Sequence, residues 1–204
     1  KSFDITSMAY GYWLNGKINV KWHHWVVKDQ HVKSVKRDYQ RFVDNWDHHD
    51  NVTICPHTIQ YDSVKAKLEE LKGGGDLRRI GFDAFGGMST EIQKWGSLED
   101  SYNPDTDLPM WPLPQTIMSM GPSTYLLESL IRHKSIAMEQ DDIVEYALAN
   151  VQLEKNINGD RRPSKLRSMG IIDPVVACVM LCGVLIKEGA ERPGAYFDAG
   201  DIAC

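Results

Sequence analysis

Three aspartates stand at positions where a mixed α/β protein exposes side chains. Asp4 lies in a predicted first strand, Asp83 ends a later strand, and Asp173 opens a strongly apolar helix. Carboxylates that are held close together repel each other unless cations neutralise them. Such oxygen ligands suit Mg²⁺ or Mn²⁺, and two ions about 4 Å apart can activate water and stabilise the leaving oxygen of a phosphodiester. The three residues therefore predict a metal cage for phosphodiester hydrolysis.

Each aspartate also has a purely structural interpretation. In a hairpin strand, Asp4 can simply face water, and Asp83 can begin a loop. Because Pro174 follows Asp173, this pair is typical of a helix N-cap with proline at the first helical position. A capping role and a catalytic role of Asp173 are compatible, so both interpretations stay open.

A group of basic residues precedes Asp173, with Gly159 and Pro163 between them. Arginine and lysine are the usual partners of phosphate groups. The group therefore predicts a phosphate clamp beside the metal site, and a solvated loop is its structural alternative. Its members are Lys155, Arg161, Arg162, Lys165 and Arg167.

Other motifs point to chemistry only weakly. The run at residues 47–50, with His57 nearby, fits no zinc-binding spacing. The chain has no Walker A motif and no Gly-x-Ser-x-Gly elbow. Its four cysteines are scattered, and two of them, Cys178 and Cys182, are expected as core residues of a reduced protein.

The composition is that of one globular domain spanning residues 1–204. The chain is 42% hydrophobic and 25% charged, which excludes a largely disordered or collagen-like protein. Its net charge of −5 argues against a simple basic nucleic-acid binder. The longest apolar run, residues 175–186, is shorter than the ~20 residues that a membrane-spanning helix needs.

The elements that would position the aspartates begin with a β-hairpin. A β-branched and aromatic strand over residues 3–14 leads into an Asn15-Gly16 turn, and alternating apolar residues follow up to Val26. Strands then alternate with helices, which predicts a mixed sheet with helices on its faces. The further expected helices are 32–46, 61–71, 88–95, 122–133, 141–150 and 173–186, the strands 52–55, 77–83 and 135–138, and the loops 96–114 and 156–169.

Several short segments occur in a fixed order along the chain and together form a recognisable pattern. They are Ile80-Gly81-Phe82-Asp83, Gln115 followed by Met120-Gly121-Pro122-Ser123, Ala149-Asn150-Val151, Pro163-Ser164-Lys165, and Ile172-Asp173-Pro174-Val175-Val176-Ala177.

Over residues 61–186 this order resembles the C-terminal nuclease domain of the large terminase subunit of tailed bacteriophages, of the HK97-like type. Phe3-Asp4-Ile5-Thr6-Ser7 resembles the family's Gly-Ile-Asp-Leu-Ser motif, although the acidic residue that often follows it is missing here. Pro174 also replaces the glycine that usually follows the last aspartate.

The resemblance implies an RNase H-like fold, a mixed sheet with helices on both faces. It also implies a metal-dependent endonuclease that cuts concatemeric viral DNA during genome packaging, using two Mg²⁺ or Mn²⁺ ions. Asp4, Asp83 and Asp173 would then be the catalytic and metal-binding residues, with Asp4 bridging both ions. Lys165 and its basic neighbours would contact DNA.

The same resemblance implies the partners. These are double-stranded DNA, an ATPase motor domain of the same polypeptide that is expected to precede Lys1, the portal and the small terminase subunit. The expected location is the cytoplasm of the infected host, without a membrane. Two alternatives stay open: another RNase H-like nuclease of the resolvase or integrase type, and a non-catalytic docking module that would show no metal dependence.

Overall fold

The computed structural model describes residues 5–28, 46, 48–83, 89–96, 103, 105 and 107–191. The described chain begins with the predicted hairpin, in which β1 (Thr6–Leu14) pairs antiparallel with β2 (Lys17–Val27). Asn15 and Gly16 both have positive φ, 53° and 73°, as a tight two-residue hairpin turn requires. The hairpin therefore forms for the local reason that the sequence predicts.

Strand β2 is the centre of the main sheet. Its first half pairs in parallel with β6 (Ile136–Met138), and its second half pairs in parallel with β3 (Val52–Cys55). The alternating residues Ile18, Val20 and Trp22 are all buried and pack against helices on one face. Towards its end the strand is buried on the other face as well, through Trp25.

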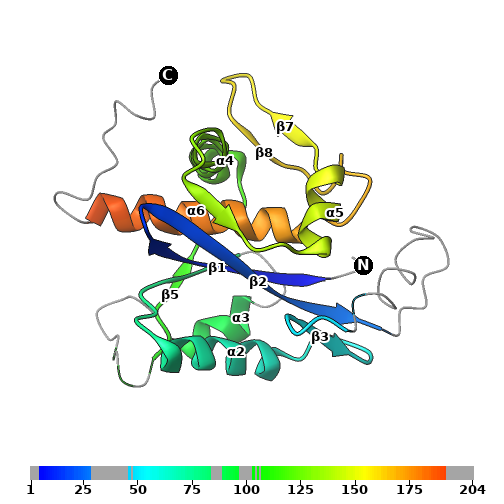
Figure 1. Ribbon diagram of the computed structural model, residues 1–204, viewed down its shortest axis with the longest axis vertical. Coiled ribbons are helices and arrows are strands. Elements are labelled where there is room, and N and C mark those ends of the chain that lie inside the picture. Colours follow the sequence, from blue (N-terminus) through cyan, green and yellow to red (C-terminus); the bar gives the residue numbers. More distant parts are fainter. Residues whose placement is uncertain are drawn as a thin grey trace.

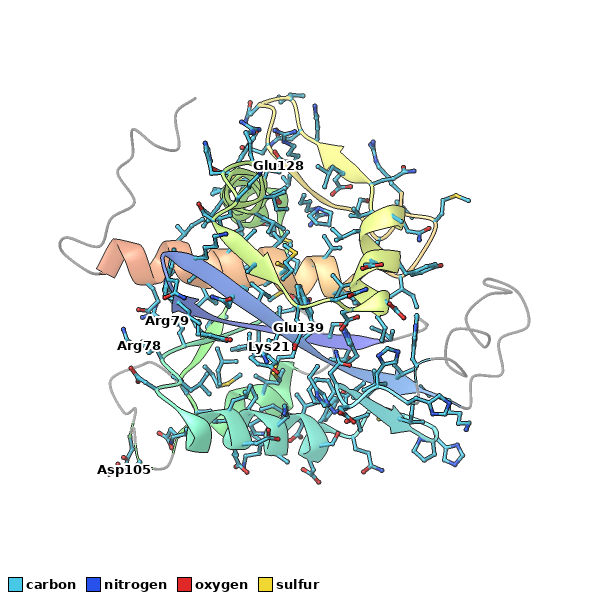
Figure 2. The ribbon with its side chains drawn as sticks, in the orientation of Figure 1. Lys21, Arg78, Arg79, Asp105, Glu128 and Glu139 are labelled. Carbon is cyan, nitrogen blue, oxygen red and sulfur yellow. The ribbon has the colours of Figure 1, made fainter. Side chains whose placement is uncertain are left out.

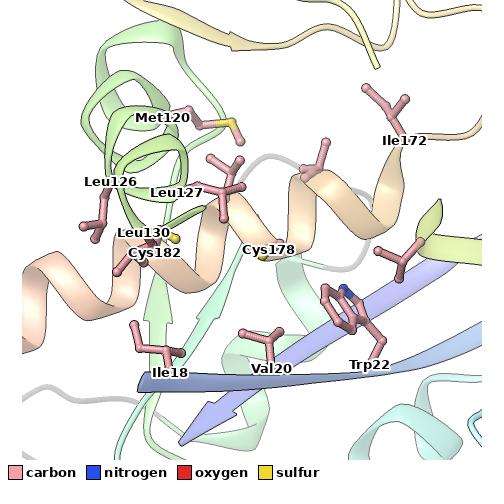
Figure 3. Close-up of a cluster of buried hydrophobic side chains, with 13 residues drawn as sticks. Ile18, Val20, Trp22, Met120, Leu126, Leu127, Leu130, Ile172, Cys178 and Cys182 are labelled. Carbon is pink, nitrogen blue, oxygen red and sulfur yellow. The ribbon is translucent and has the colours of Figure 1, made fainter. Parts of the chain in front are cut away.

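Helices cover both faces of this sheet, as predicted (Figure 1). On one face lie α4 (Ile117–Arg132), α5 (Asp142–Asn150) and α6 (Asp173–Glu191). On the other face lie α2 (Tyr61–Gly74), the short α3 (Ser89–Ile92) and the 3₁₀ turn η1 (Gln93–Trp95). Figure 3 shows how side chains from α4, α6 and β2 meet in the largest buried cluster.

Two small sheets complete the described part of the chain. Strand β4 (Ile80–Phe82) pairs in parallel with β5 (Met110–Pro112), and β7 (Leu153–Lys155) forms an antiparallel hairpin with β8 (Arg161–Pro163). Among the described residues, β4 and β5 are not hydrogen-bonded to the main sheet. Within that same part of the chain, no helix is long and apolar enough to cross a membrane.

Some predicted boundaries were wrong. The expected loops 96–114 and 156–169 contain β5 and β8, which are three residues long and include a proline each, so they carry no periodic signal. Helix α4 begins at Ile117, because the Thr116 hydroxyl accepts a hydrogen bond from the Ser119 amide, and Pro122 lies inside the helix. The predicted helix over residues 32–46 lies outside the described residues, apart from its last one.

Candidate functional site

Residues of β1, β4, α2 and α6 line a cavity of about 1580 Å³. Asp83 and Asp173, two of the three predicted metal ligands, both line it, and so does Lys165. Asp4 lies outside the described residues, but the next residue, Ile5, lines the same cavity. The fold thus brings two distant acidic positions, and the residue that follows the third, to the lining of one cavity.

Buried neighbours hold both described aspartates in place. Asp83 directly follows Phe82, which packs in an apolar cluster beneath β4. Asp173 is the first residue of α6 and follows Ile172, of which 1% is exposed. Each carboxylate therefore lies at the end of an element whose preceding side chain is in the core.

The side chain of Lys165 contacts one of these carboxylates directly. Its Nζ lies 2.5 Å from Oδ1 of Asp173, and the Asp173 side chain is 19% exposed whereas that of Lys165 is 55% exposed. A positive charge is thus already accommodated at Asp173. The lysine is the more exposed partner of the pair.

The other predicted basic residues are not equivalent to each other. Arg162 pairs with Glu154 at 2.5 Å and donates to the backbone oxygen of Gln115, which also lines the cavity. The Arg162 guanidinium lowers the pKa of Glu154 below its ordinary value. This arginine therefore ties β7 and β8 to the start of α4.

Arg161 has a similar structural role. It lies 3.0 Å from Glu128 on α4 and stacks over the ring of Tyr125 at 4.8 Å (Figure 2). Lys155 and Arg167, in contrast, are exposed. The structure thus separates the five basic residues into Arg161 and Arg162, which attach the β7–β8 hairpin to α4, Lys165 on the cavity wall, and two exposed cations.

Arg78 and Arg79, both labelled in Figure 2, precede β4 and line the cavity. Arg79 lies 3.0 Å from Glu188 of α6 and 4.0 Å from the centre of the Trp111 ring. Only 10% of its side chain is exposed, so this arginine holds β4 and β5 against α6.

A series of hydrogen bonds that the sequence motifs did not predict links side chains of the sheet to Ser7, which lines the cavity. The Ser7 hydroxyl lies 2.9 Å from Nδ1 of His24, and Nε2 of His24 lies 3.0 Å from Oδ2 of Asp141. Asn51 donates a further bond of 2.6 Å to the same carboxylate oxygen. His24 is fully buried. The period-two pattern placed His24 on the buried face of its strand, and a buried histidine needs partners, which was the available signal.

Asp141 also caps helix α5. Its Oδ1 accepts from the amides of Ile143 and Val144 at 2.8 and 3.0 Å. Burial on its own would raise the pKa of Asp141, but the hydrogen bonds that it accepts from His24, from the Val144 amide and from Asn51 hold it at about 2. The carboxylate is therefore ionised and acts only as an acceptor.

No group of three or more histidines, cysteines, aspartates or glutamates lies close enough to hold a metal ion among the residues that the structure describes. A metal cage at the cavity would need Asp4 in addition to Asp83 and Asp173. In the alternative histidine-rich segment, His49 lies 4.0 Å from Asp142 of α5.

Comparisons with known proteins agree with this architecture. No family model matches the sequence. The chain is 27% identical over 146 residues to the terminase large subunit of Enterobacteria phage HK97, which covers 69% of this chain and 27% of that relative. The crystal structure of the HK97 bacteriophage large terminase matches 89% of this chain and 37% of its own, with a TM-score of 0.71 and 21% identity. The large terminase nuclease from thermophilic phage G20c matches 93% of this chain and 84% of its own, with a TM-score of 0.48 and 11% identity.

The chain is homologous to part of the HK97 large subunit and shares the fold of the matched part. This confirms the resemblance that was based on the sequence motifs. It also confirms the predicted RNase H-like, mixed α/β fold class. The chain spans about a quarter of the length of that curated relative, since the match covers 27% of it.

Proposed function

From homology to the HK97 large subunit, we propose that this chain is the nuclease domain of a large terminase subunit, and that residues 1–204 act as one domain. It would cut concatemeric viral DNA during genome packaging as a metal-dependent endonuclease. The observation that carries the proposal is that Asp83 and Asp173, far apart in the sequence, line the same cavity together with Lys165. The residue after Asp4 lines it too.

The donor set suits a hard divalent cation. Asp4, Asp83 and Asp173 would hold two Mg²⁺ or Mn²⁺ ions, since carboxylate oxygens are the preferred ligands of both. The ammonium of Lys165, 2.5 Å from Asp173, supports this fit because a cation already occupies that carboxylate's surroundings. When bound, the ions would make water more acidic and stabilise charge on the leaving oxygen.

The chain's own residues would do the remaining work. Asp83 and Asp173 would hold the ions, and Lys165, the more exposed partner of Asp173, would contact a phosphate group. The exposed Lys155 and Arg167 would contact the DNA backbone, because phosphate contacts position a duplex without reading its sequence. Low sequence preference is therefore expected.

The wider setting follows from the same proposal. The substrate would be double-stranded DNA, in the cytoplasm of the infected host. The partners would be the ATPase motor domain of the same polypeptide, the portal and the small terminase subunit. A net charge of −5 fits a domain whose sustained grip on DNA comes from such partners.

Plasmid cleavage tests the function. The parent chain and Asp83→Ala are incubated with supercoiled DNA in Mn²⁺, Mg²⁺ or EDTA, and Asp62→Ala, an exposed acid on α2, serves as the matched control. The parent and the control should nick or linearise DNA only with metal. Asp83→Ala should lose more than the roughly 10- to 100-fold that outer-shell residues cost.

Equal cleavage by Asp83→Ala would refute the aspartate assignment. If the parent chain cleaves no DNA in Mn²⁺, Mg²⁺ or EDTA, the result would favour the non-catalytic docking module. Cleavage of branched DNA alone would favour a nuclease of the resolvase type. Joining of DNA strands would favour the integrase type.

A further inference from the structure

The hydrogen-bonded chain Ser7–His24–Asp141 ends at the wall of the candidate active-site cavity. Ser7 and His24 are directly opposite each other in the β1–β2 ladder. His24 and Asp141 are buried, whereas Ser7 is partly exposed and lines the cavity. These hydrogen bonds therefore connect the N-terminal cap of α5, across β2 and β1, to the hydroxyl group of a residue that lines the cavity.

Residues at the start of α6 pack against the two strands that carry Ser7 and His24. Ile5, two residues before Ser7, packs in one buried cluster with Ile171. Trp22, two residues before His24 on the same strand face, donates to the backbone oxygen of Pro174 at 3.3 Å. Because residues 171 and 174 are both held by neighbours of the Ser7–His24 pair, Asp173 lies over the same part of the sheet as the Ser7 hydroxyl.

The positions of the hydrogen atoms decide whether the Ser7 hydroxyl is a donor or an acceptor towards the cavity. Every partner of the Asp141 carboxylate other than the histidine is an N–H donor, so the carboxylate takes the Nε2 proton of His24 as an acceptor. In a neutral imidazole the other nitrogen, Nδ1, then has no hydrogen and accepts one from Ser7. The single hydrogen of Ser7 points inward, and the lone pairs of its Oγ are left for the cavity.

We propose that Asp141 and His24 are positioning residues that hold the Ser7 hydroxyl oxygen as a fixed hydrogen-bond acceptor in the cavity, where it orients the water molecule that attacks the phosphodiester. This role rests on the proposed nuclease function. Ser7 forms no covalent bond. It accepts a hydrogen from the water, so that a lone pair of the water is directed away from the strand and towards the substrate phosphorus.

The protein contains a second histidine–hydroxyl pair that can serve as a control. His23, next to His24, has its Nε2 2.8 Å from the hydroxyl of Thr53, and both residues are partly exposed. Desolvation, followed by the nearby charge of Lys67, lowers the pKa of His23 to about 4, so its imidazole is neutral. Neither His23 nor Thr53 is among the described residues that line the cavity. This pair has the same chemistry without access to the site.

Steady-state cleavage with Mn²⁺ tests the proposal on Ser7→Ala, Ser7→Thr, His24→Gln and the control Thr53→Val. Ser7→Ala should lower kcat roughly 10- to 100-fold, the range of outer-shell residues, with DNA affinity in EDTA unchanged. Ser7→Thr keeps the hydroxyl and should stay near the parent. The amide of Gln can donate to Asp141 from the position of Nε2, but its oxygen does not coincide with Nδ1, the acceptor of Ser7, so His24→Gln should match Ser7→Ala, and the double variant should add little.

An NMR measurement on the metal-free protein gives a readout apart from cleavage. The ¹⁵N ring signals of His24 should show the Nε2–H tautomer, and Ser7→Ala should shift only Nδ1. Hydrogen on Nδ1, whether in the other neutral tautomer or in the imidazolium, would overturn the proposal, because Ser7 would then be an acceptor of that hydrogen.

The outcomes separate the two proposals. If the parent cleaves DNA and Ser7→Ala cleaves it equally well, the role of Ser7 is wrong and the nuclease function stands. If the parent cleaves with no metal ion, both fall. If Ser7→Ala loses kcat only together with melting temperature, or if Thr53→Val loses as much, the hydroxyl is structural and the positioning role is refuted.

Discussion

At the scale of single residues, the availability of a charge depends on its partners more than on its type. Arg161 and Arg162 are cations in a polar segment, yet each has a carboxylate within 3.0 Å, from Glu128 and Glu154 respectively. Lys155 and Arg167 are of the same type and are exposed. Arg161 and Arg162 must leave an acid before they approach a phosphate group, whereas the exposed Lys155 and Arg167 are the more accessible cations, with the charge of Arg167 near Glu154.

The double change of Lys155→Ala with Arg167→Ala should therefore weaken DNA binding and reduce the slope of log affinity against log salt by about two, one for each phosphate contact. Fluorescence anisotropy across a salt series measures both. Arg162→Ala should instead lower the free energy of unfolding by about 1–3 kcal/mol, because a partly buried carboxylate loses its donor. Equal losses of DNA affinity from both changes would contradict this division.

At the scale of elements, the position of Asp83 depends on a strand of three residues. Strand β4 lies against α6 and the segment after β5 so closely that a Cβ on Gly81 would be 2.5 Å from Cδ1 of Leu113 and 2.7 Å from Cγ2 of Val184. Such distances leave no room for a methyl group unless a neighbour moves. Glycine at this position is therefore what allows β4 to approach α6.

Gly81→Ala should lower the free energy of unfolding by about 1–3 kcal/mol through overpacking, and should reduce cleavage because Asp83 moves with the strand. Gly73→Ala is the matched change: Gly73 is inside α2 with open space around it, and alanine there should stabilise by about 0.5–1 kcal/mol. Thermal unfolding of both variants measures the difference. A Gly81→Ala protein as stable as the parent would contradict the close contact.

At the scale of the whole molecule, the net charge and the fold both bear on the proposed cation site. The chain carries a net charge of −5, and the fold places two of its carboxylates on the wall of one cavity. Any ion that binds these carboxylates only in the folded state stabilises that state by mass action. Metal binding is thus coupled to the stability of the whole domain.

Millimolar Mn²⁺ should raise the melting temperature, and EDTA should reverse the rise. At 100 times the dissociation constant, the gain is about 2.7 kcal/mol. Asp83→Asn should lack the metal-dependent rise, whereas the exposed Asp62→Asn should keep it. Differential scanning fluorimetry at several metal concentrations is the measurement. A rise that persists in Asp83→Asn would mean that the ions bind elsewhere.

Much of this architecture follows from local patterns. The Asn15-Gly16 turn, the alternation from Ile18 to Trp22 and the apolar helix at Asp173 are strong signals, because each depends on backbone preference or on a regular period. The order of the motifs indicated the family resemblance and the fold class. The roles of the three aspartates stay a prediction, with Asp4 outside the described residues.

Tertiary structure alone decided how these elements and charges are paired. Strands β5 and β8 are too short to show a period, so only their partners β4 and β7 define them. The sequence placed five cations near Asp173, but the pairing of β7 with β8 gave Arg162 its acid, and the packing of this hairpin on α4 gave Arg161 its own. The Ser7–His24–Asp141 chain spans residues 17 and 117 positions apart, and no local pattern can specify contacts over such separations.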